Sequence, residues 1–337
     1  MQRLSIVIPL TGSVQRMEDS LVSVLENRPA NCQIVVVLNE VYADPYDLKN
    51  EVRFVYTPIG CGPVECLNRG IDAAEGQIVH VLTAGAEVSS AWSEAAMAHF
   101  EDGRVAAVAP LILRSDDPHR VVSAGLEYRR GGASRRSSRG SQLAEIPHQA
   151  RSTLGPDMLA GFYRKSALGL VDRFCGETGV AYSAVDLALK LRHAGHECVF
   201  EPNCRVYAHE SLAAGEGVVL QTLQAERLFW RWAPSQGLWG SLPAHAFTVC
   251  WHTLAAFPRP AMLGRIVGRF LGLCGIGLHG RHYRQLAQLR DRGESATARV
   301  PAPHTPMTSA PDSTGSLLSS AGSECTNSSA LQRRLLG

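Results

Sequence analysis

The sequence predicts an α/β protein with a central, mostly parallel sheet and helices on both faces. Three observations lead to this class: strand and helix patterns alternate from the start, the strand segments are continuous apolar runs, and the segments between them have helical spacing. Continuous apolar runs are typical of strands buried on both faces, and regular alternation is typical of a parallel sheet.

The first part of the chain supplies most of this sheet. The apolar runs predict five strands, at residues 4–9, 33–38, 52–56, 78–82 and 105–113. The segments between them predict helices at residues 16–26, 62–74 and 90–100. In the first of these helices, Met17, Leu21 and Val24 recur at the spacing that places them on one side.

Residues 114–156 change in character. Arginine recurs there among Gly and Ser, at positions 129, 130, 135, 136 and 139. This composition predicts a mobile basic loop. Two roles stay open for it: a solvated linker, or a lid whose arginines meet phosphate or an anionic acceptor.

The second half predicts short strands and then helices. We place extended segments at residues 158–163, 198–201 and 204–208, and helices at residues 165–171, 182–194, 216–233, 242–257 and 261–291. The tail is rich in Ser, Thr, Pro and Ala, which predicts disorder because it cannot bury enough apolar surface. We therefore expect a first domain at 1–215, a helical extension at 216–292 and a disordered tail at 293–337.

Composition excludes some partners and favours a cellular compartment. The net charge is only +2, which gives no global field that would attract nucleic acid or a membrane. Nine cysteines are scattered without a Cys-x-x-Cys pair, which favours reduced thiols and a cytoplasmic protein.

A further segment needs to be compared with membrane helices. Residues 236–257 contain no Asp, Glu, Lys or Arg, but Pro243 and two histidines interrupt them. A spanning helix needs about 20 predominantly apolar residues. We expect core or membrane-surface helices here, with peripheral membrane contact through residues 236–278.

Several segments, in this order, resemble the family-2 glycosyltransferases. They are Ser5-Ile-Val-Ile-Pro-Leu-Thr11, Ile34-Val-Val-Val-Leu-Asn39, the helix Cys66–Gln77 with Asn68, the stretch Leu159–Leu168, and the helix and strands of Val185–Glu210. The last contains Asp-Leu-x-x-Lys-x-x-x-x-Gly followed by two strands that end in His, a pattern fairly specific to that family. The resemblance covers roughly residues 3–211.

The resemblance implies a type-A glycosyltransferase fold with a helical C-terminal extension. It implies transfer of a sugar from a nucleotide sugar to a glycan or lipid-linked acceptor in polysaccharide biosynthesis, with a divalent metal as cofactor. The positions that match the family's donor site are Pro9, Thr11, Asn39, Asn68, Thr83, Gly85 and Glu87. The positions on the acceptor side are Gly161 and Ala184.

The chemistry-bearing positions depart from the family pattern. The acidic metal motif falls on Thr83, Ala84 and Gly85, and the carboxylate that would accept the acceptor's proton falls on Ala184. A metal on carboxylates neutralises the leaving diphosphate, and an inverting transferase needs a base. The resemblance leaves His209 as a metal ligand, and Glu87 as either a replacement ligand or a surface acid.

Asp186 is the remaining catalytic candidate. It follows Ala184 by two helical positions, a rotation of about 200°, so its side chain points elsewhere. Its alternative roles are an ion pair with Lys190, which lies four residues on, or a residue that starts the helix.

Three functions stay open at this point. The first is an active transferase with an unusual site, in which the arginines of 129–139 neutralise diphosphate without a metal. The second is a catalytically inactive relative that binds a nucleotide sugar, a glycan or a partner protein. The third is a scaffold that acts through the helices of 216–291.

Overall fold

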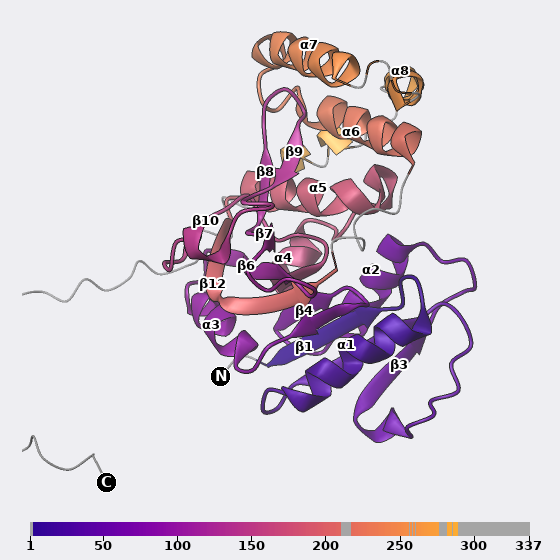
Figure 1. Ribbon diagram of the computed structural model, residues 1–337, viewed down its shortest axis with the longest axis vertical. Helices are drawn as coiled ribbons and strands as arrows, with labels where there is room; N and C mark the ends of the chain where they lie inside the picture. Colours follow the sequence, from indigo (N-terminus) through magenta and orange to yellow (C-terminus); the bar gives the residue numbers. More distant parts are fainter. Residues whose placement is uncertain are drawn as a thin grey trace, which may run out of the picture. The chain divides into compact units, whose positions relative to one another are not determined.

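A ten-stranded mixed sheet lies at the centre of the computed structural model (Figure 1). The structure describes residues 3–209, 217–255, 257, 259, 261–275, 282–284 and 286–288, which all belong to one unit, Met1–Val300. The predicted tail, 293–337, lies outside the described residues, and the domain boundary at 215 stays a prediction.

The strands follow the order β10-β12-β6-β11-β4-β1-β2-β3, with β5 on β12 and β7 on β6. Their bounds are β1 Leu4–Pro9, β2 Gln33–Leu38, β3 Val52–Tyr56, β4 Ile78–Leu82, β5 Ala86–Val88, β6 Val105–Arg114, β7 Val121–Ser123, β10 Arg151–Ser152, β11 Ala160–Arg164 and β12 Glu197–Ala208. The strands from β3 to β4 are parallel, β6 and β12 are parallel to each other, and β11 joins the two groups in antiparallel pairing. The α/β class and the five strands of the first part are confirmed.

Helices cover both faces, as predicted. Their bounds are α1 Val14–Glu26, α2 Pro63–Ala73, α3 Trp92–Ala98, α4 Lys165–Leu170, α5 Gly179–His193, α6 Val218–Trp232, α7 Leu238–Leu254 and α8 Ala261–Cys274, with short 3-10 turns η1 Leu48–Asn50, η2 His99–Glu101, η3 Leu143–Glu145 and η4 Gly176–Thr178.

The alternation of side chains along β1 separates two cores. Ile6 and Ile8 pack in the cluster that contains α1 and α3, whereas Val7 packs in the cluster that contains α2, α4 and α5. The contact of α2 is close, because a Cβ added at Gly70 would lie 2.3 Å from Cγ1 of Val7. Only glycine allows this approach of helix to sheet.

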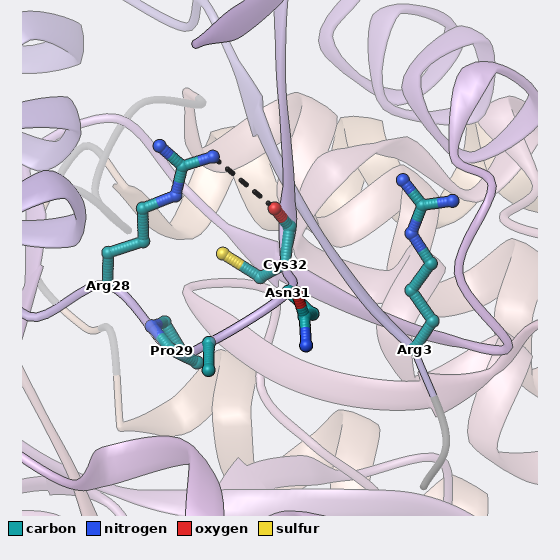
Figure 2. A pocket seen from close by; sticks show the side chains of 6 residues that line it. Arg3, Arg28, Pro29, Asn31 and Cys32 are labelled. Carbon is teal, nitrogen blue, oxygen red and sulfur yellow. Dashed lines mark hydrogen bonds between the residues drawn. The ribbon is translucent and has the colours of Figure 1, made fainter.

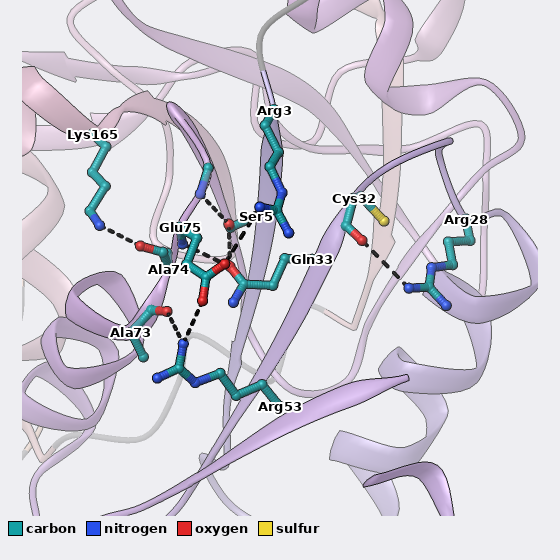
Figure 3. Close-up of polar contacts among 11 residues, drawn as sticks. Arg3, Ser5, Arg28, Cys32, Gln33, Arg53, Ala73, Ala74, Glu75 and Lys165 are labelled. Atoms are coloured by element: carbon teal, nitrogen blue, oxygen red, sulfur yellow. Dashed lines mark hydrogen bonds and ion pairs between the residues drawn. The ribbon is translucent and has the colours of Figure 1, made fainter. Parts of the chain in front are cut away.

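A hydrogen-bond network closes the edge at which β1 and β2 begin (Figure 3). The side-chain oxygen of Gln33 accepts from Ser5 Oγ at 2.6 Å and from the Glu75 amide at 2.8 Å. Ser5 Oγ in turn accepts from the Gly76 amide at 2.8 Å. The loop between α2 and β4 is therefore fixed to the amino ends of two strands.

Two expectations for the elements are wrong. Residues 114–156 are not a simple loop, since they contain β7, β10, η3 and a two-stranded hairpin of β8 Leu126–Tyr128 and β9 Ser134–Arg136. The two short strands expected at 198–208 are one strand, β12, whose register shifts between Glu201 and Arg205. Pro202 and Asn203 look like a break in the sequence but form a bulge within the ladder.

The predicted helical extension is present. Helix α6 packs on α5 and on α8, and α7 and α8, drawn in orange, lie on the far side of α6 from α5 (Figure 1). Within the described residues, none of the helices has both the length and the hydropathy required to cross a bilayer. The eight cysteines that the structure describes are all unpaired.

Candidate functional site

The candidate site lies at the carboxyl edge, which we define as the edge where β1, β2 and β4 end. The three strands are parallel neighbours, so the residues that follow them meet at this edge. Pro9 ends β1 and is buried, and Thr11 follows it with a buried hydroxyl that has no hydrogen-bond partner among the described residues. Asn39 follows β2 and donates to the carbonyl of Cys61 at 3.5 Å.

The segment after β4 is tied to its neighbours by polar contacts. Thr83 Oγ1 donates to the carbonyl of Met158 at 2.8 Å, and Ala84 is fully buried. The amide of Gly85 donates to Ser20 Oγ at 2.8 Å, and this glycine has a φ of +90°. These residues therefore supply structure at the position where the family's metal motif falls.

His209 lies beside this segment because of the strand register. Ala208 lies opposite Ala86 on β5 and opposite Arg114 on β6, so His209 is one step beyond both pairs. The pKa of Asp116 is held below its ordinary value, mainly by hydrogen bonds from Arg114 and also by the nearby His209. Asp116 and His209 thus place a carboxylate and an imidazole close together, near the ends of β6 and β12.

Glu87 is exposed on β5, opposite Tyr207. It makes no ion pair within the described part of the chain, and its neighbours Ala86 and Val88 are buried. Its role in donor binding stays a prediction.

Asp186 lies in a fully buried ion cluster behind α5. Its carboxylate accepts from Arg231 Nε and from Trp232 Nε1, both at 2.8 Å, and lies 3.3 Å from Lys190 Nζ. The ion pair with Lys190 is confirmed. The side chain has no exposed surface, so the catalytic candidacy of Asp186 has no support from its position.

The cluster also fixes the protonation state of Asp186. Burial alone would raise the pKa of the carboxyl, but Lys190, Arg231 and the Trp232 N–H outweigh burial and hold the pKa below its ordinary value. The carboxylate is therefore ionised at neutral pH: Oδ1 accepts both hydrogen bonds, and Oδ2 lies 3.3 Å from Lys190 Nζ.

The predicted acceptor side contains small and buried residues. A Cβ added at Gly161 would lie 2.5 Å from Pro156 Cβ, and Ala184 is 3% exposed. Asn68 exchanges two hydrogen bonds with the backbone of Phe174, at 2.8 and 3.2 Å. Asn68 thus joins α2 to the loop before α5, and both the nitrogen and the oxygen of its side-chain amide take part in this contact.

Two of the basic residues expected to meet diphosphate are already paired. Arg136 Nε lies 2.6 Å from the buried carboxylate of Asp157, and Arg135 Nε lies 2.7 Å from Glu127. A paired guanidinium contributes little net charge to a diphosphate, so these two residues do not support a lid that neutralises it.

Arg16 is a basic residue at the carboxyl edge that the sequence reasoning missed. It lies in the first turn of α1, its side chain is exposed, and a Cβ added at Gly12 would lie 3.9 Å from its Nη1. Gly12 has a φ of +97° and Ser13 caps the helix, so the backbone turns sharply from β1 into α1 here. The recognisable pattern is a basic residue in the first turn of the helix that follows the first strand.

The residues at the edge do not fit a divalent metal. Mg²⁺ and Mn²⁺ prefer carboxylate and other oxygen ligands. The metal-motif positions carry a hydroxyl bonded to a carbonyl, a methyl group and a hydrogen, and the part of the chain described here contains no group of three His, Cys, Asp or Glu that could hold a metal. We therefore derive no chemical step through a metal.

A hollow at the opposite edge is a poor candidate. It has a volume of about 550 Å³ and is lined by Arg3, Arg28, Pro29, Ala30, Asn31 and Cys32, at the amino ends of β1 and β2 (Figure 2). Figure 2 shows Arg28 donating to the carbonyl of Cys32 across it. Ligands of open α/β sheets bind at the carboxyl ends of strands, so this hollow lies at the wrong edge.

The sheet order, the helices on both faces and the helical C-terminal region define a protein of the type-A glycosyltransferase fold. Residues 5–155 match the model of glycosyl transferase family 2. The resemblance drawn from the sequence is thereby confirmed.

Solved structures agree with this fold. GalNAc-T7 with UDP, GalNAc and Mn²⁺ is similar with a TM-score of 0.50 and 15% identity, over 70% of this chain and 51% of that chain. This chain thus spans about half the length of the GalNAc-T7 chain.

Two further structures were found. The mannosyltransferase PcManGT from Pyrobaculum calidifontis with GDP-Man and Mn²⁺ has a TM-score of 0.49 and 15% identity, over 88% of this chain and 86% of that chain. S. aureus TarS has a TM-score of 0.49 and 12% identity, over 68% of this chain and 39% of that chain. The comparison with curated proteins gave no match.

Proposed function

We propose that this chain binds a nucleotide sugar at its carboxyl edge without a divalent metal, and transfers the sugar to a glycan or lipid-linked acceptor. The family match over residues 5–155 supports the substrate class. The observation that carries the metal-free part is the position of Arg16 beside Gly12, at the edge where the metal motif is replaced by Thr83, Ala84 and Gly85.

Arg16 supplies the charge that the diphosphate requires. A guanidinium binds phosphate oxygens with charge-assisted hydrogen bonds, and the amino end of α1 adds a favourable dipole. Thr11 adds a hydroxyl with no other partner among the described residues. We propose that this side of the edge holds the nucleotide diphosphate.

The acceptor's proton needs a base, and Ala184 provides none. Two groups available at this edge are Asp116 and His209, and the exposed Asp116 has a lowered pKa, so it stays ionised at neutral pH. We propose that this pair takes the proton as the acceptor oxygen bonds to the sugar, while the bond between the sugar and the diphosphate breaks and the nucleoside diphosphate leaves.

The proposal extends to the cellular setting. We place the protein in the cytoplasm and in polysaccharide biosynthesis, with peripheral membrane contact through residues 236–278. Such contact would bring a lipid-linked acceptor to the protein.

A second candidate is a relative that binds the nucleotide sugar and does not transfer it. It is favoured by one observation, which is that the base position carries the buried Ala184. In this case the carboxyl edge is a binding site for a nucleotide sugar, a glycan or a partner protein.

Isothermal titration calorimetry with UDP and GDP, with and without Mn²⁺, tests the proposal. We expect one nucleotide to bind, with an affinity that Mn²⁺ leaves within about twofold. Arg16→Gln should weaken binding about tenfold, since a hydrogen bond to a charged group contributes about 1.5–3 kcal/mol. Arg28→Gln, just beyond the other end of α1, is the matched control and should not change the affinity.

Three other outcomes have definite meanings. Tightening by Mn²⁺ of tenfold or more would refute the metal-free site. Binding without release of nucleoside diphosphate from UDP- or GDP-sugars, across a panel of glycan and lipid-linked acceptors, would select the second candidate. Failure to bind either nucleotide would refute the proposed transfer and nucleotide-sugar binding, and would leave a glycan-binding or partner-binding edge or the scaffold function of the C-terminal helices.

A further inference from the structure

The helices α7 and α8 expose large apolar side chains. We define the outer face by six of them, which are between 62% and 87% exposed: Trp239, Phe247, Trp251, Leu254, Leu263 and Phe270. Scattered single exposures are normal on a protein surface, but a contiguous apolar patch marks an interaction site.

Helical spacing places these residues on continuous stripes. On α7, Trp239, Phe247, Trp251 and Leu254 are eight, four and three residues apart. On α8, Leu263 and Phe270 are seven residues apart, and Ile266 and Val267 between them are also exposed. Each helix therefore presents one apolar side to its surroundings.

The inner side of α8 contains small groups. A Cβ added at Gly268 would lie 2.4 Å from the carbonyl oxygen of Val219, and one added at Gly272 would lie 2.5 Å from Glu226 Cβ. Helix α8 thus approaches the backbone of α6 closely.

The inner side of this layer also contains the charged groups. Arg269 on α8 pairs with the buried Glu226 on α6, which lies 2.9 Å from His245 Nε2 on α7. The polarity is the reverse of a helix that faces water, because glycines and this buried ion cluster lie inside and large apolar groups lie outside. Such an arrangement suits a helix whose outer side lies in an apolar medium.

The charges around the outer face indicate which apolar medium it contacts. Residues 227–290 contain no Asp or Glu, and they include Arg259 and Arg265 beside the outer face. The nearest acid, Glu226, is already engaged by Arg269 and His245. A cationic apolar face complements an anionic lipid surface, whereas two copies of it in a symmetric dimer would repel each other.

We propose that the outer face of α7 and α8 inserts into the interfacial layer of an anionic membrane, with both helices lying in the membrane plane. Tryptophan favours this layer, and an interfacial helix buries its apolar side while arginines meet the lipid headgroups. The inference rests on the membrane contact in the proposed function and not on sugar transfer.

Co-sedimentation of the whole chain with lipid vesicles tests this inference. We compare vesicles of phosphatidylcholine alone with vesicles that also contain phosphatidylglycerol. The double variant Trp251→Glu with Phe270→Glu should weaken binding to the anionic vesicles at least about tenfold, because two apolar anchors are replaced by acids. Both side chains are exposed, so the fold should persist, as circular dichroism would verify.

Matched controls separate this face from the rest of the surface. The double variant Val41→Glu with Ile59→Glu also replaces two exposed apolar side chains, 90% and 87% exposed, and should bind as the unaltered chain does. Arg259→Gln should weaken binding about fivefold, the effect of about one arginine at an anionic surface, whereas Lys49→Gln should have no effect.

Two results would overturn the inference: no binding to anionic vesicles, or equal loss in both double variants. Self-association that only the Trp251 and Phe270 substitutions abolish would also overturn it, in favour of a second copy of the chain. The calorimetric assay with nucleotides is independent, so vesicle binding without nucleotide binding would remove the proposed function alone.

Discussion

Asp186 shows how one carboxylate can be assigned its role from its surroundings. The sequence left it as a substitute base or as a partner of Lys190. In the structure it receives hydrogen bonds from Arg231 and Trp232 as well, and no part of it reaches solvent. A base must reach the acceptor's proton, so this carboxylate joins α5 to α6 instead.

Because Asp186 joins α5 to α6, its substitution should reduce stability. Asp186→Asn should lower the free energy of unfolding by about 3–5 kcal/mol, because it leaves the buried Lys190 without its counter-charge and leaves Arg231 with only the exposed Glu177. The control Asp72→Asn breaks an exposed pair with Arg173 and should cost less than about 1 kcal/mol. Urea unfolding of both variants checks the difference, and equal losses would contradict the buried role.

At the scale of elements, the sequence predicted best those segments whose pattern is local and strong. The strands β1 to β4 and β6 are continuous apolar runs, so their burial on both faces is visible in the sequence. The strands within 114–156 were missed because they are only two or three residues long, which is too short to show an alternating pattern. Their pairing depends on partners distant in the chain, such as Phe200 for Arg151.

The packing of α8 on α6 makes a prediction at this scale. Gly268→Ala should destabilise the helical extension by about 1–3 kcal/mol, because its Cβ would lie 2.4 Å from a backbone oxygen of α6. Gly264→Ala is the matched control: its Cβ would make an ordinary 3.4 Å contact, and alanine should stabilise the helix by about 1 kcal/mol. Thermal unfolding should shift in opposite directions, and a stabilised Gly268→Ala variant would exclude the close approach.

At the scale of the whole molecule, topology brings the site together and long-range contacts decide what each residue does. The family resemblance placed Thr11, Asn39 and Thr83 together in a donor site, and the parallel order of β1, β2 and β4 brings them to one edge. The pattern did not reveal that Arg16 lies beside Gly12, because this depends on how the chain turns from β1 into α1. Nor did it reveal the neighbourhood of His209 and Asp116, which the register of β12 on β6 creates.

Through His80, the stability of the central sheet depends on pH. It lies on β4 between β1 and β11, fully buried against Trp92 and Phe162, and burial lowers its pKa to about 3. The folded chain therefore keeps this imidazole neutral, whereas the unfolded chain binds a proton below a pKa of about 6.5. Protonation must wait for the central strands to separate, so His80 opposes the folded state of the whole molecule as the pH falls.

The lowered pKa of His80 predicts how stability changes with pH. Stability should be greatest above pH 6.5 and should fall by about 2 kcal/mol at pH 5 through His80 alone. His80→Leu should reduce this slope without abolishing it, because burial also lowers the pKa of His196 and His252. Asp186 and Glu226 also have lowered pKa values, but their protonation reduces stability only below about pH 4.5, so it does not affect the range from pH 5 to 7.5. Urea unfolding between pH 5 and 7.5 measures the slope, with the exposed His119→Leu as control, and an unchanged slope in His80→Leu would show that the core imidazole takes up its proton without unfolding.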